Sequence, residues 1–134
     1  PALRVAWSAA VWPEGKYDYI LCHFGANGRK AVQLREAGLV EGPVVTVFHG
    51  SDIHTYPKRF RYPIYRELFA WGDLFLTVSE LGREQLLRMG CPEDRLHLLR
   101  MGVDKDFFRY RFRNPGQDYR ILTIGRLVEA KGLR

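Results

Sequence analysis

The sequence predicts an α/β fold with a parallel β-sheet. Short apolar segments alternate with helical stretches of about ten residues, which is typical of right-handed β-α-β crossovers. The predicted strands are also continuous apolar runs, a pattern typical of parallel strands that are covered on both faces. We therefore expect a Rossmann-like sheet within residues 17–103, with four parallel strands and helices on both faces.

The first predicted β-α-β unit covers residues 17–48. An apolar strand at residues 17–23 is followed by a turn from Gly25 to Gly28. Residues 29–37 have helical periodicity, and Gly38 is placed to end that helix. The second strand, at residues 44–48, is rich in β-branched side chains, which favour extended structure.

The alternation continues to residue 100. Pro63 suits the first turn of a helix that runs to Trp71. A third strand at residues 73–78 leads into Ser79, which is placed to cap a helix that Gly90 closes. Residues 95–100 complete the series as a fourth strand.

A linker interrupts this pattern. Residues 101–118 have no helical periodicity and contain the breaker NPG at residues 114–116. An apolar strand is predicted again at residues 120–124. We therefore divide the chain into an α/β unit at residues 1–103, an interdomain linker at residues 104–118, and the start of a second domain at residues 119–134.

Length and charge limit the class of protein. The chain has 134 residues and a net charge of +6, which favours an anionic partner such as nucleic acid, acidic lipid or a phosphorylated small molecule. Its basic residues are spread out, with loose clusters at residues 58–61 and 109–113 that are equally typical of a solvated surface. No apolar run approaches the roughly 20 residues that cross a bilayer.

Cysteine content and the chain ends add further expectations. Cys22 and Cys91 are far apart and belong to no CxxC pair, so we expect both to be reduced and buried in a cytoplasmic protein. No His or Cys spacing is typical of a metal site, and we expect neither a metal nor a cofactor. The chain begins at Pro1 and ends two residues after Gly132, so we expect an internal fragment of a longer protein.

Ligands of open parallel sheets bind beyond the carboxyl ends of the strands, so the residues that follow each strand are functional candidates. His23 ends the first predicted strand, and His49 follows the second, with Asp52 three residues further. A strand-end histidine often bonds only to neighbouring backbone. Two histidines at equivalent strand ends, however, favour a shared cleft that receives a sugar hydroxyl or a phosphate.

A second candidate site follows the last predicted strand. Gly125 has no Cβ, so a ligand can approach the backbone there. Arg126 supplies a planar, permanently charged fork, and Lys131 a mobile positive charge. Their position directly after a strand is suited to holding a pyrophosphate.

Residues 125–132 (GRLVEAKG) resemble the GRL…KG motif of glycosyltransferase family 4, the retaining enzymes of GT-B architecture. Residues 101–104 (MGVD) are similar to the GVD…F segment that precedes the interdomain linker in that family. Residues 48–52 (FHGSD) and 76–79 (LTVS) resemble strand ends of its acceptor domain. Residues 22–28 (CHFGANG) resemble the exopolysaccharide branch, the colanic acid and amylovoran type.

On the donor side, the resemblance assigns roles to four residues. Arg126 and Lys131 would neutralise the departing nucleotide diphosphate, with Gly125 beside them. His49 would face the donor sugar or its phosphate. Negative charge develops on the diphosphate as the sugar–phosphate bond breaks, so fixed cations there would take the place of a metal ion.

On the acceptor side, the resemblance assigns His23, Asn27 and Asp52. It implies a retaining hexosyl-type transfer from a nucleotide-sugar donor to a lipid-linked or oligosaccharide acceptor in polysaccharide biosynthesis. We expect peripheral contact with the anionic inner face of the membrane and no nucleic acid. The chain would be the second half of the acceptor domain, the linker and the first strand of the donor domain, and would be inactive alone.

Three features of the sequence depart from the family pattern. The glycine-rich loop near the start of the family's first domain is not in the sequence, the E-x7-E motif would lie beyond Arg134, and Met101 replaces a common Asn.

Two other functions fit some of the same residues. A non-catalytic basic module would bind nucleic acid or anionic surfaces through aromatic and basic residues of segments 58–61 and 109–113. An isomerase such as a sugar-nucleotide epimerase would also use a phosphate site.

Overall fold

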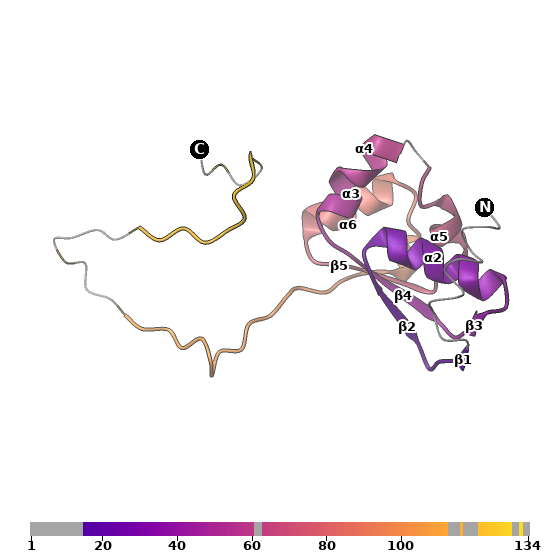
Figure 1. Ribbon diagram of the computed structural model, residues 1–134, viewed down its shortest axis with the longest axis horizontal. Coiled ribbons are helices and arrows are strands. Elements are labelled where there is room, and N and C mark those ends of the chain that lie inside the picture. Colours follow the sequence, from indigo (N-terminus) through magenta and orange to yellow (C-terminus); the bar gives the residue numbers. More distant parts are fainter. Residues whose placement is uncertain (1–14, 61–62, 113–115, 117–120, 130–131, 133–134) are drawn as a thin grey trace. The chain divides into compact units, whose positions relative to one another are not determined.

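The computed structural model describes residues 15–60, 63–112, 116, 121–129 and 132 of the chain (Figure 1). Contacts between residues divide the chain into two units, residues 1–102 and residues 103–134. The first unit contains the sheet and its helices.

Four parallel strands form the central sheet of the first unit. They lie in the order β2 (Ile20–His23), β4 (Val44–Phe48), β5 (Leu74–Thr77) and β6 (Leu96–Leu98). In the register, Ile20 lies opposite Val44, Val45 opposite Leu74, and Phe75 opposite Leu96. A separate parallel pair, β1 (Gly15–Lys16) with β3 (Val40–Glu41), was not predicted. The predicted α/β fold with a parallel sheet is confirmed.

The helices that connect the strands are α2 (Gly25–Glu36), α5 (Arg66–Trp71) and α6 (Glu80–Arg88). Two short helices, α3 (Ser51–His54) and α4 (Tyr56–Phe60), follow β4, and a 3-10 turn at Glu93–Arg95 precedes β6. Ser79 caps α6 as predicted, because its Oγ accepts the N–H of Gly82 at 3.1 Å. No helix in the described part of the chain is long and apolar enough to span a membrane.

Helix α2 begins four residues earlier than predicted, so the expected turn from Gly25 to Gly28 is wrong. Both glycines lie in the first turn of the helix and are buried. A Cβ on Gly25 would lie 2.5 Å from the Phe48 ring and 2.6 Å from the Tyr65 ring, and one on Gly28 would meet the Thr46 side chain. The glycines therefore let the start of α2 pack directly against β4.

The hydrophobic core lies on one face of the sheet. Cys22, Val44, Phe48, Phe75 and Leu96 belong to a single buried cluster with side chains of α2, α5 and α6. On the opposite face Val47 is buried, but Val45, Leu74 and Leu76 are half-buried and Leu21 is 50% exposed.

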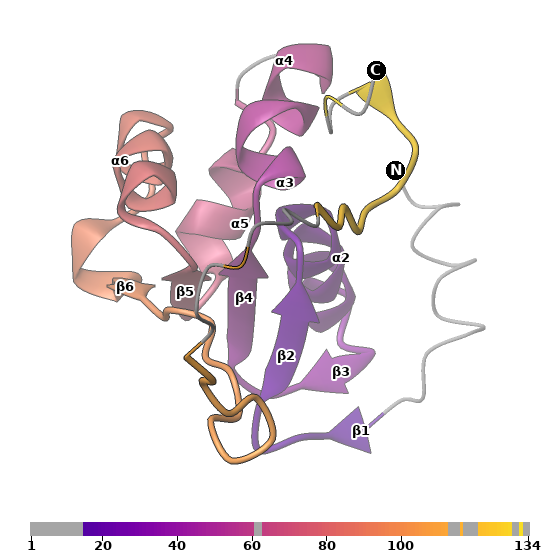
Figure 2. The same ribbon diagram turned by 90° about the vertical axis from the view of Figure 1, so that its left-hand side faces the viewer.

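The expectation of helices on both faces is therefore wrong for the described residues. The strand order advances in one direction from β2 to β6, so each right-handed crossover passes over the same face. In Figure 2, β2 and β4 stand in front of α2 and α5. Continuous apolar strands predicted two covered faces, whereas the strand order decides which face the connecting helices cover.

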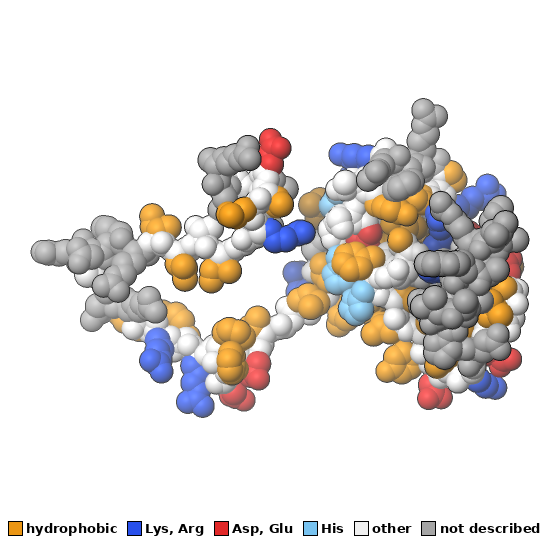
Figure 3. Space-filling view, viewed as in Figure 1, with side chains coloured by type: hydrophobic (Ala, Val, Ile, Leu, Met, Phe, Trp, Pro, Cys, Tyr) orange, Lys and Arg blue, Asp and Glu red, His pale blue; other side chains and the backbone are white. Residues whose placement is uncertain are grey.

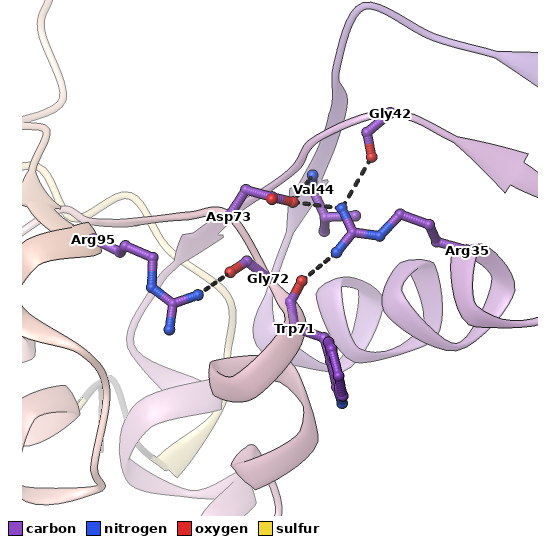
Figure 4. Close-up of polar contacts among 7 residues, drawn as sticks. All are labelled: Arg35, Gly42, Val44, Trp71, Gly72, Asp73 and Arg95. Carbon is purple, nitrogen blue, oxygen red and sulfur yellow. Dashed lines mark hydrogen bonds and ion pairs between the residues drawn. The ribbon is translucent and has the colours of Figure 1, made fainter.

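Two arginines fix the amino-terminal edge of the sheet (Figure 4). Arg35 of α2 donates to the carbonyls of Gly42 and Trp71 and pairs with Asp73, at 2.5 Å from Nη1 to Oδ2. The same Asp73 oxygen accepts the N–H of Val44 at 2.7 Å. Arg95 donates to backbone carbonyls at the end of α5. These bonds join α2, α5 and the starts of β4 and β5 at one edge of the sheet, remote from the carboxyl ends of the strands.

The residues of the second unit that the structure describes are exposed, and none of them belongs to an α-helix or a strand. The Asp104 carboxylate accepts the N–H groups of Asp106 and Phe107, which makes a local turn. The strand predicted at residues 120–124 is absent over residues 121–124, where Ile121 is 93% and Ile124 88% exposed. An apolar segment becomes a strand only where another strand pairs with its backbone, and none of the strands that the structure describes pairs with this one.

Candidate functional site at the carboxyl ends of β2 and β4

His23 and His49 lie side by side because β2 and β4 are neighbouring parallel strands. The structure places His23 Nδ1 3.0 Å from His49 Nε2, although the residues are 26 positions apart in sequence. His23 is exposed and His49 is half-buried. The two strand-end histidines that the sequence singled out therefore form one pair. Histidine side chains and hydrophobic side chains share this surface of the first unit in Figure 3.

The geometry of this pair is that of an in-plane hydrogen bond. The ring centroids are 5.3 Å apart and the planes differ by 22°. The centroid separation exceeds the 3.0 Å N···N distance by about the sum of two ring radii, so the contact runs from ring edge to ring edge. One nitrogen donates and the other accepts, and each ring keeps its other nitrogen for a further partner.

Asp52 holds the two strand ends together from beneath. It is 4% exposed. Its Oδ2 accepts the backbone N–H of Gly25 at 2.9 Å, and its Oδ1 accepts the N–H of His49 at 3.0 Å. The Tyr65 hydroxyl donates to the Asp52 carbonyl at 2.9 Å. Both carboxylate oxygens of Asp52 are therefore bound inside the protein, and its predicted place on the acceptor side stays a prediction.

Asn27 lies on the first turn of α2 and is exposed. Its Nδ2 donates to the backbone carbonyl of His23 at 2.8 Å. This bond ties the end of β2 to the start of the helix. Its predicted contact with an acceptor stays a prediction.

Phe24 is a residue of the site to which sequence reasoning gave no role. It is the only non-glycine residue with positive φ among those that the structure describes, at φ 70° and ψ 136°. Its ring lies 4.7 Å from the His49 ring, tilted by 45°, and the side chain is 43% exposed. The sequence signal that could have identified Phe24 is its position, since it is an aromatic residue between a strand-end histidine and a glycine.

Neither cysteine takes part in this site. Cys22 and Cys91 are free and buried, as predicted. Burial raises the pKa of the Cys22 thiol to about 11 and that of the Cys91 thiol to about 12, so neither is a reactive nucleophile at neutral pH. Within the described ranges, no group of three or more His, Cys, Asp or Glu side chains could hold a metal ion.

The predicted pyrophosphate site belongs to the second unit. Gly125 and Arg126 are exposed, and the backbone carbonyl of Arg126 accepts the N–H of Val128 at 2.8 Å. Lys131 lies outside the described residues. The roles predicted for these three residues stay predictions.

Comparison with known proteins agrees with the motifs. The model of Glycosyltransferase Family 4 matches residues 2–107. The chain is 41% identical, over 118 residues, to the proteins described as colanic acid biosynthesis glycosyltransferase WcaL of Salmonella typhimurium and of Escherichia coli K12. It is 40% identical over 121 residues to the amylovoran biosynthesis glycosyltransferase AmsK of Erwinia amylovora. Each alignment covers 87% of the chain and 29% of the relative.

Proposed function

Since the chain belongs to glycosyltransferase family 4, as its motifs predicted, we propose that it is part of an enzyme of exopolysaccharide biosynthesis that transfers a sugar from a nucleotide-sugar donor. The observation that carries this proposal is the His23–His49 pair, which the fold places at the carboxyl edge of the sheet where ligands of such sheets bind. Family membership favours this function over a nucleic-acid-binding module or an isomerase.

On the donor side, His49 faces the donor sugar or its phosphate. Gly125 lets the diphosphate approach the backbone, and Arg126 and Lys131 balance the charge that develops as the diphosphate departs. A guanidinium binds two phosphate oxygens at once, which fixes the direction in which the group leaves. We further propose that the transfer is of hexosyl type and retains the anomeric configuration.

On the acceptor side, His23 presents its free ring nitrogen, Nε2, to an acceptor hydroxyl, and Asn27 lies beside it. Asp52 acts as a positioning residue, because its buried carboxylate fixes both loops and therefore the spacing of the two imidazoles. A displacement of about 1 Å at such a site lowers the rate by about a hundredfold, so this support matters for activity.

The acceptor in this proposal is either a lipid-linked saccharide or a free oligosaccharide. The enzyme acts in the cytoplasm and without nucleic acid. The net charge of +6 on these 134 residues favours peripheral contact with an anionic membrane. The chain spans 29% of the length of its relatives, so we expect it to transfer no sugar by itself.

The test is transfer of labelled sugar by a transferase of the relatives' full length that carries this sequence. We expect transfer from at least one of UDP-glucose, UDP-galactose and GDP-mannose to membrane lipid or oligosaccharide. His49→Ala should reduce it by about a hundredfold or more. His54→Ala, at an exposed histidine of α3, is the matched control and should leave it unchanged. No transfer by the wild type, or equal loss in both variants, would contradict the proposal.

A further inference from the structure

Phe24 has a backbone conformation that its side chain does not favour. At φ 70° the Cβ of a residue other than glycine is crowded by its own backbone, and ψ 136° takes Phe24 away from the left-handed helical minimum. Glycine would adopt this conformation without that strain. Residues in such regions persist where the surroundings enforce them, and they concentrate at functional sites.

Four hydrogen bonds enforce the conformation. The N–H of Phe24 donates to the Val47 carbonyl at 2.8 Å, which continues the pairing of β2 with β4. Its carbonyl accepts the N–H groups of Asn27 and Gly28 and so begins α2. The next N–H, that of Gly25, is held by the buried Asp52. Strand pairing, helix initiation and Asp52 together determine the backbone on both sides of Phe24.

Packing alone does not explain an aromatic residue here. Phe24 is 43% exposed, so much of its ring gains nothing from burial. The strained backbone places the Phe24 ring with its centroid 4.7 Å from that of the His49 ring. His23 is the preceding residue in the sequence. The result is an apolar aromatic surface beside two imidazoles that bond to each other at their edges.

From this geometry we infer that Phe24 is a saccharide-binding residue, an aromatic platform on which a sugar ring of the acceptor stacks while His23 meets its hydroxyls. The apolar C–H face of a pyranose suits an aromatic ring, and its hydroxyls suit the imidazole nitrogens. The inference rests on the proposed function, because it takes the ligand to be a saccharide acceptor.

The first test concerns the strain and uses the 134-residue chain. Phe24→Ala and Phe24→Gly both remove the ring, but only Ala keeps a Cβ in the unfavourable conformation. Glycine is ordinarily the less stable of the two, since it loses more chain entropy on folding. We expect the opposite order at position 24, with the Gly variant melting a few degrees higher. The same pair at Glu36, exposed at the end of α2, should show the ordinary order. The ordinary order at Phe24 would overturn the inference.

The second test concerns the ligand and also uses the isolated chain. Methyl glycosides of glucose, galactose and mannose are added, and the ring resonances of Phe24, His23 and His49 are followed by NMR. We expect at least one glycoside to shift Phe24 and His23 together, and Phe24→Leu to abolish the shift at His23. No shift with any of the three, or an unaltered shift in the Leu variant, would overturn the inference and leave the proposed function in place.

The third test uses a transferase of the relatives' full length. Phe24→Leu keeps an apolar side chain but removes the aromatic face, and should raise the acceptor KM about tenfold while the donor KM stays the same. Phe24→Tyr should keep the wild-type acceptor KM. An unchanged acceptor KM in the Leu variant would overturn the inference, whereas an inactive wild type would contradict the proposed function instead.

Discussion

The carboxylate of Asp52 accepts a hydrogen bond from the backbone N–H of Gly25 at 2.9 Å, across 27 positions of sequence. Gly25 is the first residue of α2, and Asp52 lies in the short helix after β4. The bond therefore joins the loops that end the two neighbouring strands, just below the paired histidines. The other carboxylate oxygen of Asp52 accepts the N–H of His49. An ionised carboxylate fits this position because it can accept hydrogen bonds from both backbone N–H groups at once.

Asp52→Asn should weaken both the fold and the histidine pair. The amide retains one acceptor oxygen, so its NH2 group must face a backbone N–H that then lacks a partner. We expect a loss of about 1–3 kcal/mol in the free energy of unfolding, measured by urea denaturation. Asp18→Asn, at an exposed residue before β2, is the control and should change it by less than about 0.5 kcal/mol.

The same variant should also change the His23 and His49 imidazole resonances in NMR spectra, because the bond that places His49 is lost. Asp18→Asn should leave those resonances in place. Wild-type stability together with unchanged imidazole resonances in Asp52→Asn would show that the carboxylate does not position the pair.

Neighbouring residues of β5 should respond very differently to truncation. Phe75 is fully buried, against Phe48, Phe69 and the guanidinium of Arg95, whereas Leu76 is half-buried on the opposite face. Phe75→Ala should destabilise the chain by about 3–5 kcal/mol, and Leu76→Ala by less than half as much. Denaturation of both variants checks this. Equal losses would contradict a core confined to one face of the sheet.

The two thiols should resist alkylation in the folded chain. Cys22 is 3% and Cys91 5% exposed, so the reagent has little access to either. Burial also raises the pKa of both thiols, so that the reactive thiolate is even rarer at pH 8 than in an exposed cysteine. Iodoacetamide at pH 8, followed by mass spectrometry, should leave both unmodified in the native chain and label both in urea. A native chain that is labelled as fast as the unfolded one would contradict the burial of these residues.

The raised pKa values also predict a loss of stability in alkali. The thiol pKa is 9.0 when unperturbed, but about 11 for Cys22 and about 12 for Cys91 in the folded chain. Burial raises the pKa of Tyr65 as well. Above pH 9 the unfolded chain releases thiol protons that the folded chain keeps. The contribution of the two thiols to the free energy of unfolding should therefore be fully present below pH 9 and be lost between about pH 9 and 12. Cys22→Ala should make this fall shallower.

The elements that could be predicted from the sequence are those whose structure depends on residues close together in the chain. The β-branched run of β4 and the cap of α6 by Ser79 were predicted because side-chain shape and a single hydroxyl account for them. The start of α2 was missed, because Gly25 and Gly28 are typical of a turn until the rings and side chains packed against them are known.

At the site, the two histidines were found from their places after strands, and strand order explains why they meet. The burial of Asp52 and the strain at Phe24 were not predictable. Both depend on hydrogen bonds between segments that are distant in sequence, such as those that join Asp52 to Gly25 and Phe24 to Val47.

The last prediction concerns Arg126 and Lys131 in a transferase of the relatives' full length. If both contact the donor diphosphate, replacing either by Ala leaves the developing charge under-compensated in a partly dry cleft. The loss of one such contact amounts to about 2–4 kcal/mol, or about 30- to 1,000-fold in rate. The value of kcat should fall more than donor affinity does, because the charge grows toward the transition state.

Two comparisons make this prediction specific. Arg126→Lys should recover only part of the rate, since one ammonium does not reproduce a bidentate fork. Arg88→Ala, at an exposed arginine of α6 that pairs with Glu84, should keep wild-type kinetics. The measurement is kcat and donor KM for each variant. Wild-type kcat in both Arg126→Ala and Lys131→Ala would remove these residues from the site, and the donor-side proposal would then lose its main support.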